Sequence, residues 1–512
     1  MVDRGLVRRS VDAGDLDEFT ERIERQAEFL KREIADASLD NADPTIGLEI
    51  EVYAVDEDER LTRVPEGVFG DRFNKELGLH NAEINTAPSV LDADGLEEQA
   101  AQIRAVTDDA AERLAGSGTS IVFDSMWTIP PEEGTRAYLS DTERAEEMVL
   151  AKNMRDHPRY RAIDNAYLDR VEGVDIELPG VSETFPSILV ESLATSIQPH
   201  LQVPDADELP AYYNAAIRTM GPVLSLATNS PFAPPDLYAD VDPDRLLDET
   251  YHELRVPVFE QSVNLPGEDA PKKVRFPDDI ERTEDTVEKV VEDHTYSPFL
   301  REWTGEEDDA ESYTDEFWEF DFKRGTYWRW LRAVIGGEPI GDDNDERSIR
   351  IEYRPLPTQP TVRDNVALLG LVAGLLVGLV DRDHPLEELS WEDARTSFYG
   401  AVEDGMDATL HWITADGDRT TEAETIYDEI FALARHGLAS RGVDADTVDD
   451  VLGPIEARRR AATTPSRWKL RRVREALDDG VELEQAVHAM QHDYIATAAR
   501  TESFAEWFDG GG

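Results

Sequence analysis

The sequence predicts a fold of helices and strands in which one sheet carries a strongly polar face. Three observations predict it. Four short segments alternate aliphatic residues with charged or amide residues, as strands do when each face of the sheet meets a different environment. A strand–helix–strand unit is expected between residues 81 and 125. Segments with helical periodicity lie near the N-terminus and throughout the region after residue 361.

The four alternating segments are residues 46–52, 82–86, 196–202 and 349–354. Their polar positions are Glu49, Glu51, Glu83, Asn85, Gln198, His200, Gln202, Arg350, Glu352 and Arg354. Because side chains alternate sides along a strand, each segment places its polar set on one face. Carboxylates, an imidazole, amides and arginines on one face can bind hard metal ions and phosphates.

Each polar set also has an ordinary structural interpretation. Glu49 and Glu51 could lie on a half-exposed sheet of a very acidic protein, and His200 could be a histidine with its partners inside the sheet. Arg350 and Arg354 could form an ion-pair ladder that only neutralises Glu352, instead of stabilising a transferring phosphoryl group. The joint occurrence of the four sets, far apart in the chain, favours a functional site. Pro199 removes one ladder donor, which predicts an edge strand or a bulge there.

The remaining elements follow in chain order. Helices are expected over residues 16–37, 94–115, 208–228, 362–380, 420–435, 445–461, 465–477 and 483–508, and a strand over 119–123. Asp94 and Glu97 fit the start of the second helix and Thr361 caps the fourth. Residues 126–190 are expected to be loop-rich and irregular, with short helical patches, and residues 233–320 to form long loops and short helices over a site.

Residues 322–334 are aromatic and basic in an otherwise acidic chain. Helix packing explains the segment 325–330 as well as ligand contact does, and Arg329 within it could bind a substrate carboxylate with two hydrogen bonds. The break near residue 385 predicts a domain 1–385 and a helical part 386–512, which is either a separate unit or an extension of the first.

Composition limits the function. With 512 residues, 40% of them hydrophobic, the chain can bury a large core. The net charge of −60 is spread along the chain, as expected for a surface adapted to high salt, and without a basic patch it argues against nucleic acid as a partner. The absence of cysteine excludes disulfides, thiolate metal sites and a cysteine nucleophile.

One segment raises the question of a membrane. Val366–Val380 is uncharged and almost wholly apolar, but it is shorter than the roughly 18–20 residues that span a bilayer. We therefore expect a buried core helix and no membrane partner. Residues 1–15 contain no apolar run like that of a signal peptide, so the cytoplasm is the expected location. The sequence also contains no phosphate loop, no GxGxxG, no HExxH and no GxSxG, so a bound nucleotide would be held on the sheet by metals and arginines.

These residues resemble the glutamate–cysteine ligase family, within the glutamine synthetase-like carboxylate–amine ligases. The resemblance depends on Gly47–Glu51, His80–Pro88, Ser196–Val203, Leu226–Phe232 and Ile349–Pro360, which together span about residues 45–380. It implies an α+β fold: an open, curved, mostly antiparallel sheet with helices on its convex face. ATP and two or three Mg²⁺ ions would lie on the concave face, and the γ-carboxylate of glutamate would be phosphorylated and then attacked by an amine.

The resemblance also implies roles for individual residues. Glu49, Glu51, Glu83 and Glu352 become the expected metal ligands, and Gln198, His200 and Gln202 face the nucleotide or a metal. The expected catalytic residues are Arg354, Arg350 and Glu352, and the expected substrate contacts are Arg329, Arg255 and Asn85. The partners are then small molecules, glutamate and an amine. Cysteine is the family's usual amine, and another amino acid or a polyamine stays open. Two alternative functions also stay open: a non-catalytic relative that binds a nucleotide or an amino acid, and another phosphoryl-transfer reaction on the same sheet.

Overall fold

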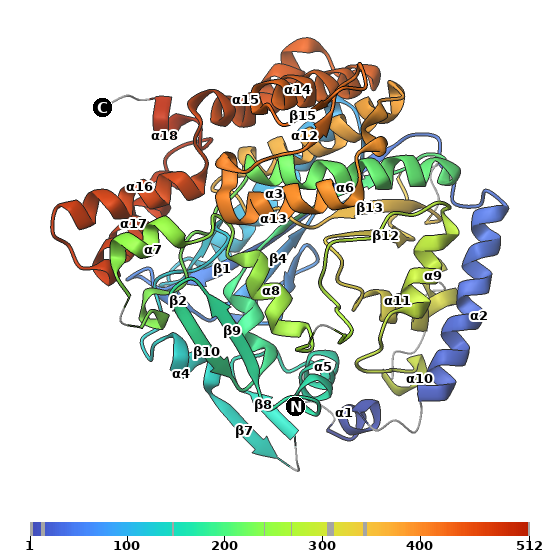
Figure 1. The fold of residues 1–512 in the computed structure, drawn as a ribbon. Helices are drawn as coiled ribbons and strands as arrows, with labels where there is room; N and C mark the ends of the chain where they lie inside the picture. Colours follow the sequence, from blue (N-terminus) through green and yellow to red (C-terminus); the bar gives the residue numbers. More distant parts are fainter. Residues whose placement is uncertain are drawn as a thin grey trace.

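The computed structural model describes residues 4–11, 16–145, 148–239, 241–267, 269–304, 312–340 and 346–509, and all contacts below refer to these residues. Its centre is one nine-stranded sheet (Figure 1). The main order is β12 (Leu331–Ile335), β13 (Ile349–Tyr353), β11 (Ile197–Gln202), β1 (Thr45–Val55), β4 (Asn81–Asn85) and β3 (Phe73–Lys75). Strands β2 (Leu61–Thr62), β5 (Ser89–Val90) and β6 (Ser120–Val122) also pair with β1, and every ladder of this sheet is antiparallel.

The apolar face of the sheet is covered by helices. Ile46, Leu48, Ile50 and Val52 alternate along β1 and are almost completely buried. Against this side pack α3 (Ala93–Leu114), α12 (Val362–Asp381) and α6 (Leu209–Ser225), with α14 (Ala423–Ser440) and α15 (Ala445–Ala461) beyond them (Figure 1). The structure therefore confirms the α+β class, with an open, mostly antiparallel sheet and a helical C-terminal part.

Helix α12 is the apolar segment noted in the sequence. By length and composition it could cross a membrane, but 89% of its most apolar window is buried inside the fold. Its glycines explain how closely it packs: a Cβ on Gly374 would come within 2.7 Å of the Ala434 carbonyl oxygen, and one on Gly378 within 2.1 Å of that of Leu433. The glycines let α12 and α14 cross with their backbones in contact, so α12 is the central helix of the core.

The polar face of the sheet is overlaid by α5 (Pro158–Leu168), α8 (Arg255–Val263) and α11 (Trp318–Arg324), and the hairpin β9 (Val174–Leu178)–β10 (Val181–Phe185) packs against α8. The expected loop region 126–190 thus contains more regular structure than predicted, including a second hairpin, β7 (Thr142–Ala145) and β8 (Met148–Ala151). Residues 174–178 of β9 alternate apolar and acidic side chains as clearly as residues 82–86 do, so this strand could have been predicted, whereas the four-residue strands β7 and β8 are too short for a clear pattern.

The other elements complete the molecule. They are α1 (Arg4–Val11), α2 (Leu16–Ala35), α4 (Thr135–Ser140), α7 (Pro243–Glu249), α9 (Glu284–Glu292), α10 (Arg301–Thr304), α13 (Trp391–Asp404), β14 (Trp412–Ile413), β15 (Arg419–Thr420), α16 (Pro465–Asp478), α17 (Leu483–Ala498) and α18 (Glu506–Asp509), with short 3₁₀ turns between them.

Three local predictions need correction. Strand β11 lies inside the sheet between β1 and β13, so the edge position expected from Pro199 is wrong. Pairing with β13 begins only at His200, and Pro199 lies just beyond the end of that ladder, where a missing donor costs little. Helix α3 is capped by Asp92, which accepts from the Gly95 N–H, and not by Asp94. Residues 325–330 are not helical; they lead into β12.

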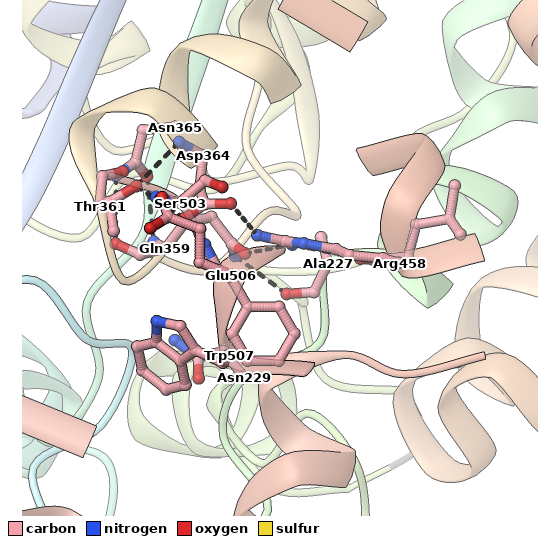
Figure 2. Close-up of polar contacts among 12 residues, drawn as sticks. Ala227, Asn229, Gln359, Thr361, Asp364, Asn365, Arg458, Ser503, Glu506 and Trp507 are labelled. Carbon is pink, nitrogen blue, oxygen red and sulfur yellow. Dashed lines mark hydrogen bonds and ion pairs between the residues drawn. The ribbon is translucent and has the colours of Figure 1, made fainter. Parts of the chain in front are cut away.

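The C-terminal helices share the core of the sheet domain. One hydrophobic cluster runs from Phe19 to Ile455, and a smaller one joins α16 and α17 to Phe232 and Leu247. Arg458 of α15 adds a fully buried ion pair with Asp364 of α12, with Nη2 to Oδ1 at 2.8 Å, and its Nη1 donates to Gln359 (Figure 2). The other oxygen of Asp364 accepts a hydrogen bond from the Phe504 N–H, which links the C-terminal end of the described chain to α12. The division expected near residue 385 stays a prediction.

Candidate active site

The register of the sheet brings the predicted polar sets onto one face. Residues directly opposite each other in antiparallel strands point to the same side. Glu49 of β1 pairs with Gln198 on one side and with Asn85 on the other. Glu51 pairs with Glu83. On the other flank His200 pairs with Glu352, and Gln202 with Arg350. Segments from residue 49 to residue 354 therefore form one polar surface.

This surface is the floor of a cleft of about 750 Å³. Helices α5, α8 and α11 form its walls. Its acidic lining consists of Glu49, Glu51, Glu66, Glu76, Glu83, Asp156 and Glu191, and its basic lining of Lys75, Arg155, Arg159, Arg324, Arg332 and Arg354. A side pocket of about 380 Å³ continues over the same face; it shares Glu49 and Glu83 with the cleft and adds Asn85, His200, Gln202 and Arg350.

Four carboxylates in the cleft repel one another. Burial raises the pKa of Glu51 to about 7, helped by the nearby Glu76. Burial also raises the pKa of Glu83 well above its usual value, with contributions from Glu49, Glu76 and Glu51. The pKa values of Glu76 and Glu191 are raised for the same reasons, burial first and neighbouring carboxylates second. Burial and the neighbouring carboxylates therefore both disfavour the ionised form of these four groups.

Glu49 differs because His200 lies beside it. Burial alone would raise the pKa of Glu49, but His200 Nε2, 3.3 Å from Oε1, brings the pKa below its usual value. Arg350 Nε donates to His200 Nδ1 at 3.0 Å, which leaves the proton of a neutral imidazole on Nε2, facing Glu49. Arg350, His200 and Glu49 thus form a polar relay across three strands.

Glu352 is held between two arginines. Arg332 Nε donates to its Oε1 at 2.9 Å and Arg354 Nη1 at 2.5 Å, and Arg354 Nη1 also donates to Gln198 Oε1 at 2.8 Å. Burial opposes ionisation, but the two arginines outweigh it and lower the pKa of Glu352 well below its usual value. The ion-pair ladder considered in the sequence is thus only half correct: Arg354 pairs with Glu352, but Arg332 takes the place expected of Arg350, which donates to His200 instead. The pairing with Glu352 fixes Arg354 at the edge of the cleft. The predicted role of Glu352 as a metal ligand stays a prediction.

The carboxylates fit a hard cation in chemistry and in charge. Their oxygens are the ligands that Mg²⁺ prefers, and a bound cation would favour the ionised form that burial and neighbouring carboxylates disfavour. Within the described ranges no three carboxylate or histidine side chains already converge on one point. Glu51 Oε2 accepts from the Ser196 N–H at 2.7 Å, and Glu83 Oε1 from Asn85 Nδ2 at 2.7 Å. Each of these bonds occupies one carboxylate oxygen, so the second oxygen of each group could bind an ion once the side chains converge.

Arg159 at the wall of the cleft makes no hydrogen bond or ion pair through its guanidinium with any described residue. Burial lowers its pKa, and the group lies 5.0 Å over the ring of Phe322. Gly325 makes room for it, since a Cβ there would come within 2.1 Å of Arg159 Nη2. A half-buried arginine with free donors in a cleft is a binding site for an anion.

The structure separates the three predicted substrate contacts. Asn85 lines the side pocket. Arg255 is buried beneath the cleft, where its Nε lies 3.3 Å from Glu253 Oε1. Arg329 lines neither hollow; its Nη2 pairs with Asp293 at 2.9 Å, beside the buried Lys273. Arg329 is thus engaged in a structural ion-pair cluster away from the sheet face.

Sequence reasoning missed several residues of the cleft. Glu76 and Glu191 lie in a loop and a 3₁₀ turn, where no alternation marks them. Arg159 lies on α5, one of the short helices expected within residues 126–190 but not placed by the sequence. Arg332 could have been found, because it is the only charged residue in the strand Leu331–Ile335 and pairs with Glu352.

Comparison with known proteins agrees with this architecture. The model of glutamate–cysteine ligase family 2 (GCS2) matches residues 45–498. The crystal structure of glutamate–cysteine ligase from Francisella tularensis, in complex with AMP, superposes with a TM-score of 0.54 at 13% identity, over 91% of this chain and 90% of that one. A bifunctional glutathione synthetase from Pasteurella multocida gives a TM-score of 0.49 at 14% identity, over 95% of this chain and 56% of that one. A comparison with curated proteins found no match.

The sheet and the family match together define a carboxylate–amine ligase fold. The chain belongs to glutamate–cysteine ligase family 2, a family of ATP-dependent ligases. The matched residues extend well past the helices α12 and α13, so the helical C-terminal part lies largely inside the family region.

Proposed function

We propose that the protein joins the γ-carboxylate of glutamate to an amine, at the cost of ATP and in the presence of Mg²⁺, with an acyl phosphate as intermediate. Cysteine is the amine proposed first, because it is the family's usual one. The observation that supports the proposal best is the single sheet face on which Glu49, Glu51 and Glu83 meet Arg354.

In this proposal the acidic residues and the arginines have separate tasks. Glu49, Glu51 and Glu83, with Glu76 beside them, would hold two or three Mg²⁺ ions together with the phosphates of ATP. When bound, the ions would neutralise phosphate charge and align the carboxylate. Gln198, His200 and Gln202 would contact the nucleotide from β11.

Arg354 would contact the transferred phosphoryl group. Gln198 and Glu352 already hold its guanidinium in one orientation, so its ordering cost is met before substrate arrives. Arg350 acts one step further away, through His200. Arg159 is the proposed contact for the α-carboxylate of glutamate, a role first expected of Arg329 and Arg255, which are both engaged elsewhere.

The setting of the reaction is also part of the proposal. The spread of negative charge suits a cytoplasm of high salt concentration, where screening weakens the mutual repulsion of surface carboxylates. The substrates are small molecules, and no nucleic acid or membrane takes part.

The test is the release of ADP by the purified protein in multi-molar KCl. We expect release that requires Mg²⁺, glutamate and an amine together, and a product whose mass equals that of the amide. Glu51→Gln should abolish turnover while the circular dichroism spectrum stays unchanged. Saturable ATP binding with no turnover on any amine would indicate a non-catalytic relative, and a phosphorylated product instead of an amide would indicate another phosphoryl transfer.

A further inference from the structure

A second pocket lies outside the cleft, on the other side of helix α8. Its volume is about 860 Å³, within the range of ligand sites. Helix α8 is the wall between the two spaces, because Phe259 and Val263 line the cleft while Glu260 and Gln261 line this second pocket. Gln261 also fastens the β9–β10 hairpin, since its Oε1 accepts from the Glu177 N–H at 2.7 Å. We call this space the α8 pocket.

The α8 pocket presents one carboxylate with a free oxygen. Glu260 Oε1 accepts from Trp330 Nε1 and from Tyr399 Oη, each at 2.8 Å. Oε2 accepts a hydrogen bond from none of the described residues. Burial raises the pKa of the Glu260 carboxyl group. A carboxylate fixed by two donors on one oxygen, with its second oxygen open to a cavity, is prepared for a cationic group of a ligand.

The same pocket presents a free cation. Arg395 of α13 makes no hydrogen bond or ion pair with a described residue; its guanidinium lies 4.9 Å from the centre of the Tyr399 ring. That ring contacts the guanidinium and also donates its hydroxyl to Glu260, so Tyr399 lies between the two charged groups. Glu260 and Arg395 therefore lie on the two sides of an aromatic residue, in a pocket that is also lined by Glu172, Asp175, Lys272 and Arg275.

Part of the wall is aromatic. Phe276 and Trp391 meet edge to face, with ring centres 5.6 Å apart, and both line the pocket with Tyr399 and Tyr167. Such a wall suits a planar or large apolar side chain. The combination of a carboxylate, a guanidinium and an aromatic wall matches the three parts of one class of small molecule.

We propose that the α8 pocket binds a free α-amino acid with an aromatic or large apolar side chain, whose ammonium group meets Glu260 and whose carboxylate meets Arg395. The site is distinct from the cleft and does not depend on the proposed ligase reaction.

The structure also gives a path from this pocket to the cleft. Glu260 holds the indole of Trp330, and the carbonyl oxygen of Trp330 accepts from the Arg354 N–H at 3.0 Å. The Arg255 guanidinium lies 5.3 Å over the Trp330 ring. A ligand that recruits Glu260 would thus act on the strand end that carries Arg354. This consequence, unlike the binding itself, rests on the proposed function.

The binding test uses isothermal titration of the intact protein with L-phenylalanine, without ATP. We expect saturable binding at one site per chain, at least tenfold weaker binding of phenethylamine and of 3-phenylpropionate, which each lack one charge, and at least tenfold weaker binding of L-phenylalanine to Glu260→Gln and to Arg395→Ala. The control variant Arg471→Ala, at an exposed arginine of α16, should bind as the parent does. Glu51→Gln, in the cleft, should also keep full affinity.

Several results would overturn the proposal. They are the absence of saturable L-phenylalanine binding up to tens of millimolar, equal binding of the two singly charged analogues, unchanged affinity in both pocket variants, or loss of binding in Glu51→Gln. ADP release is measured separately: a changed KM for glutamate at saturating L-phenylalanine supports the path through Trp330, and an unchanged KM with intact binding removes the path but not the site.

Discussion

Glu51 of β1 and Glu83 of β4 stand directly opposite each other, on the same face of the sheet. Directly opposed residues have Cβ atoms about 4.5–5.5 Å apart, and like charges in such a pair are destabilising. Glu76 and Glu191 line the same cleft and add to the repulsion. The fold keeps this destabilising pair at its centre. Binding of a cation would offset the repulsion and would explain why both carboxylates are present.

Replacing Glu83 should change the free energy of unfolding and the catalytic activity in opposite directions. Glu83→Gln keeps the shape and removes the charge, so we expect the metal-free protein to gain about 1 kcal/mol in free energy of unfolding at neutral pH while ADP release falls to background. Thermal unfolding in EDTA measures the gain. Added Mg²⁺ should then stabilise the parent more than the variant, because an ion stabilises only the state that binds it. A variant that is no more stable in EDTA and responds to Mg²⁺ like the parent would contradict the cation role of this pair.

Arg159 offers a test of the substrate anion site. Arg159→Ala removes the free guanidinium, and we expect KM for glutamate to rise about 10- to 100-fold with KM for ATP little changed. Gly325→Ala should raise KM for glutamate in the same direction, because its Cβ would meet Arg159 Nη2. Gly67→Ala, which has nothing within 4 Å of its Cβ, is the matched control. If Arg159→Ala raises KM for ATP instead, Arg159 binds phosphate and not the substrate carboxylate.

Asp164 gives a prediction on pH. It is fully buried on α5, where it accepts from Ser187 Oγ and the Ile188 N–H, and burial raises its pKa from 3.8 to about 7. Between these two values the folded chain holds a proton that the unfolded chain has lost, so this group's contribution to stability decreases as the pH rises from 3.8 to 7. Asp164→Asn cannot ionise, and its stability relative to the parent should increase by about 1–3 kcal/mol between pH 5 and pH 8. Denaturant titrations at the two pH values measure this, and a difference independent of pH would show that the carboxyl group does not titrate there.

The buried pair of Arg458 and Asp364 predicts a large loss of stability. Arg458→Met leaves Asp364 buried without its cation, which should cost about 3–5 kcal/mol (Figure 2). The double variant with Asp364→Asn should recover part of that cost. As a control, Arg363→Met removes a partner of the exposed Asp450 and should cost less than about 1 kcal/mol. Equal losses for the two single variants, measured by thermal unfolding, would contradict the importance of burial.

The sequence could predict the polar face because strand alternation is a local rule. In each strand the aliphatic residues that alternate with the polar ones are buried in the core, so the polar residues face the other side. The strand register then brings together Glu49, Gln198, His200 and Arg350. The resemblance to a family supplied the open, mostly antiparallel sheet, but the strand order, which no local pattern encodes, came only from the structure.

What the sequence could not predict depends on tertiary packing. Glu76, Glu191 and Arg159 lie in a loop, a 3₁₀ turn and a short helix whose position the sequence did not give, so nothing in their neighbours marked them. Arg329 was selected for its aromatic and basic surroundings, but its charge pairs with Asp293, which is 36 residues away in the chain. Pro199 could not reveal that the ladder with β13 ends beside it.

The most direct measurement of the central claim is a crystal structure of the protein with Mn²⁺ in place of Mg²⁺ and a non-hydrolysable ATP analogue, in which anomalous scattering locates the ions. The account predicts anomalous peaks within coordination distance of Glu49, Glu51 and Glu83, bridged to the phosphates of the analogue, with Arg354 facing the terminal phosphate. Ions and nucleotide bound elsewhere, with these carboxylates unchanged, would contradict it.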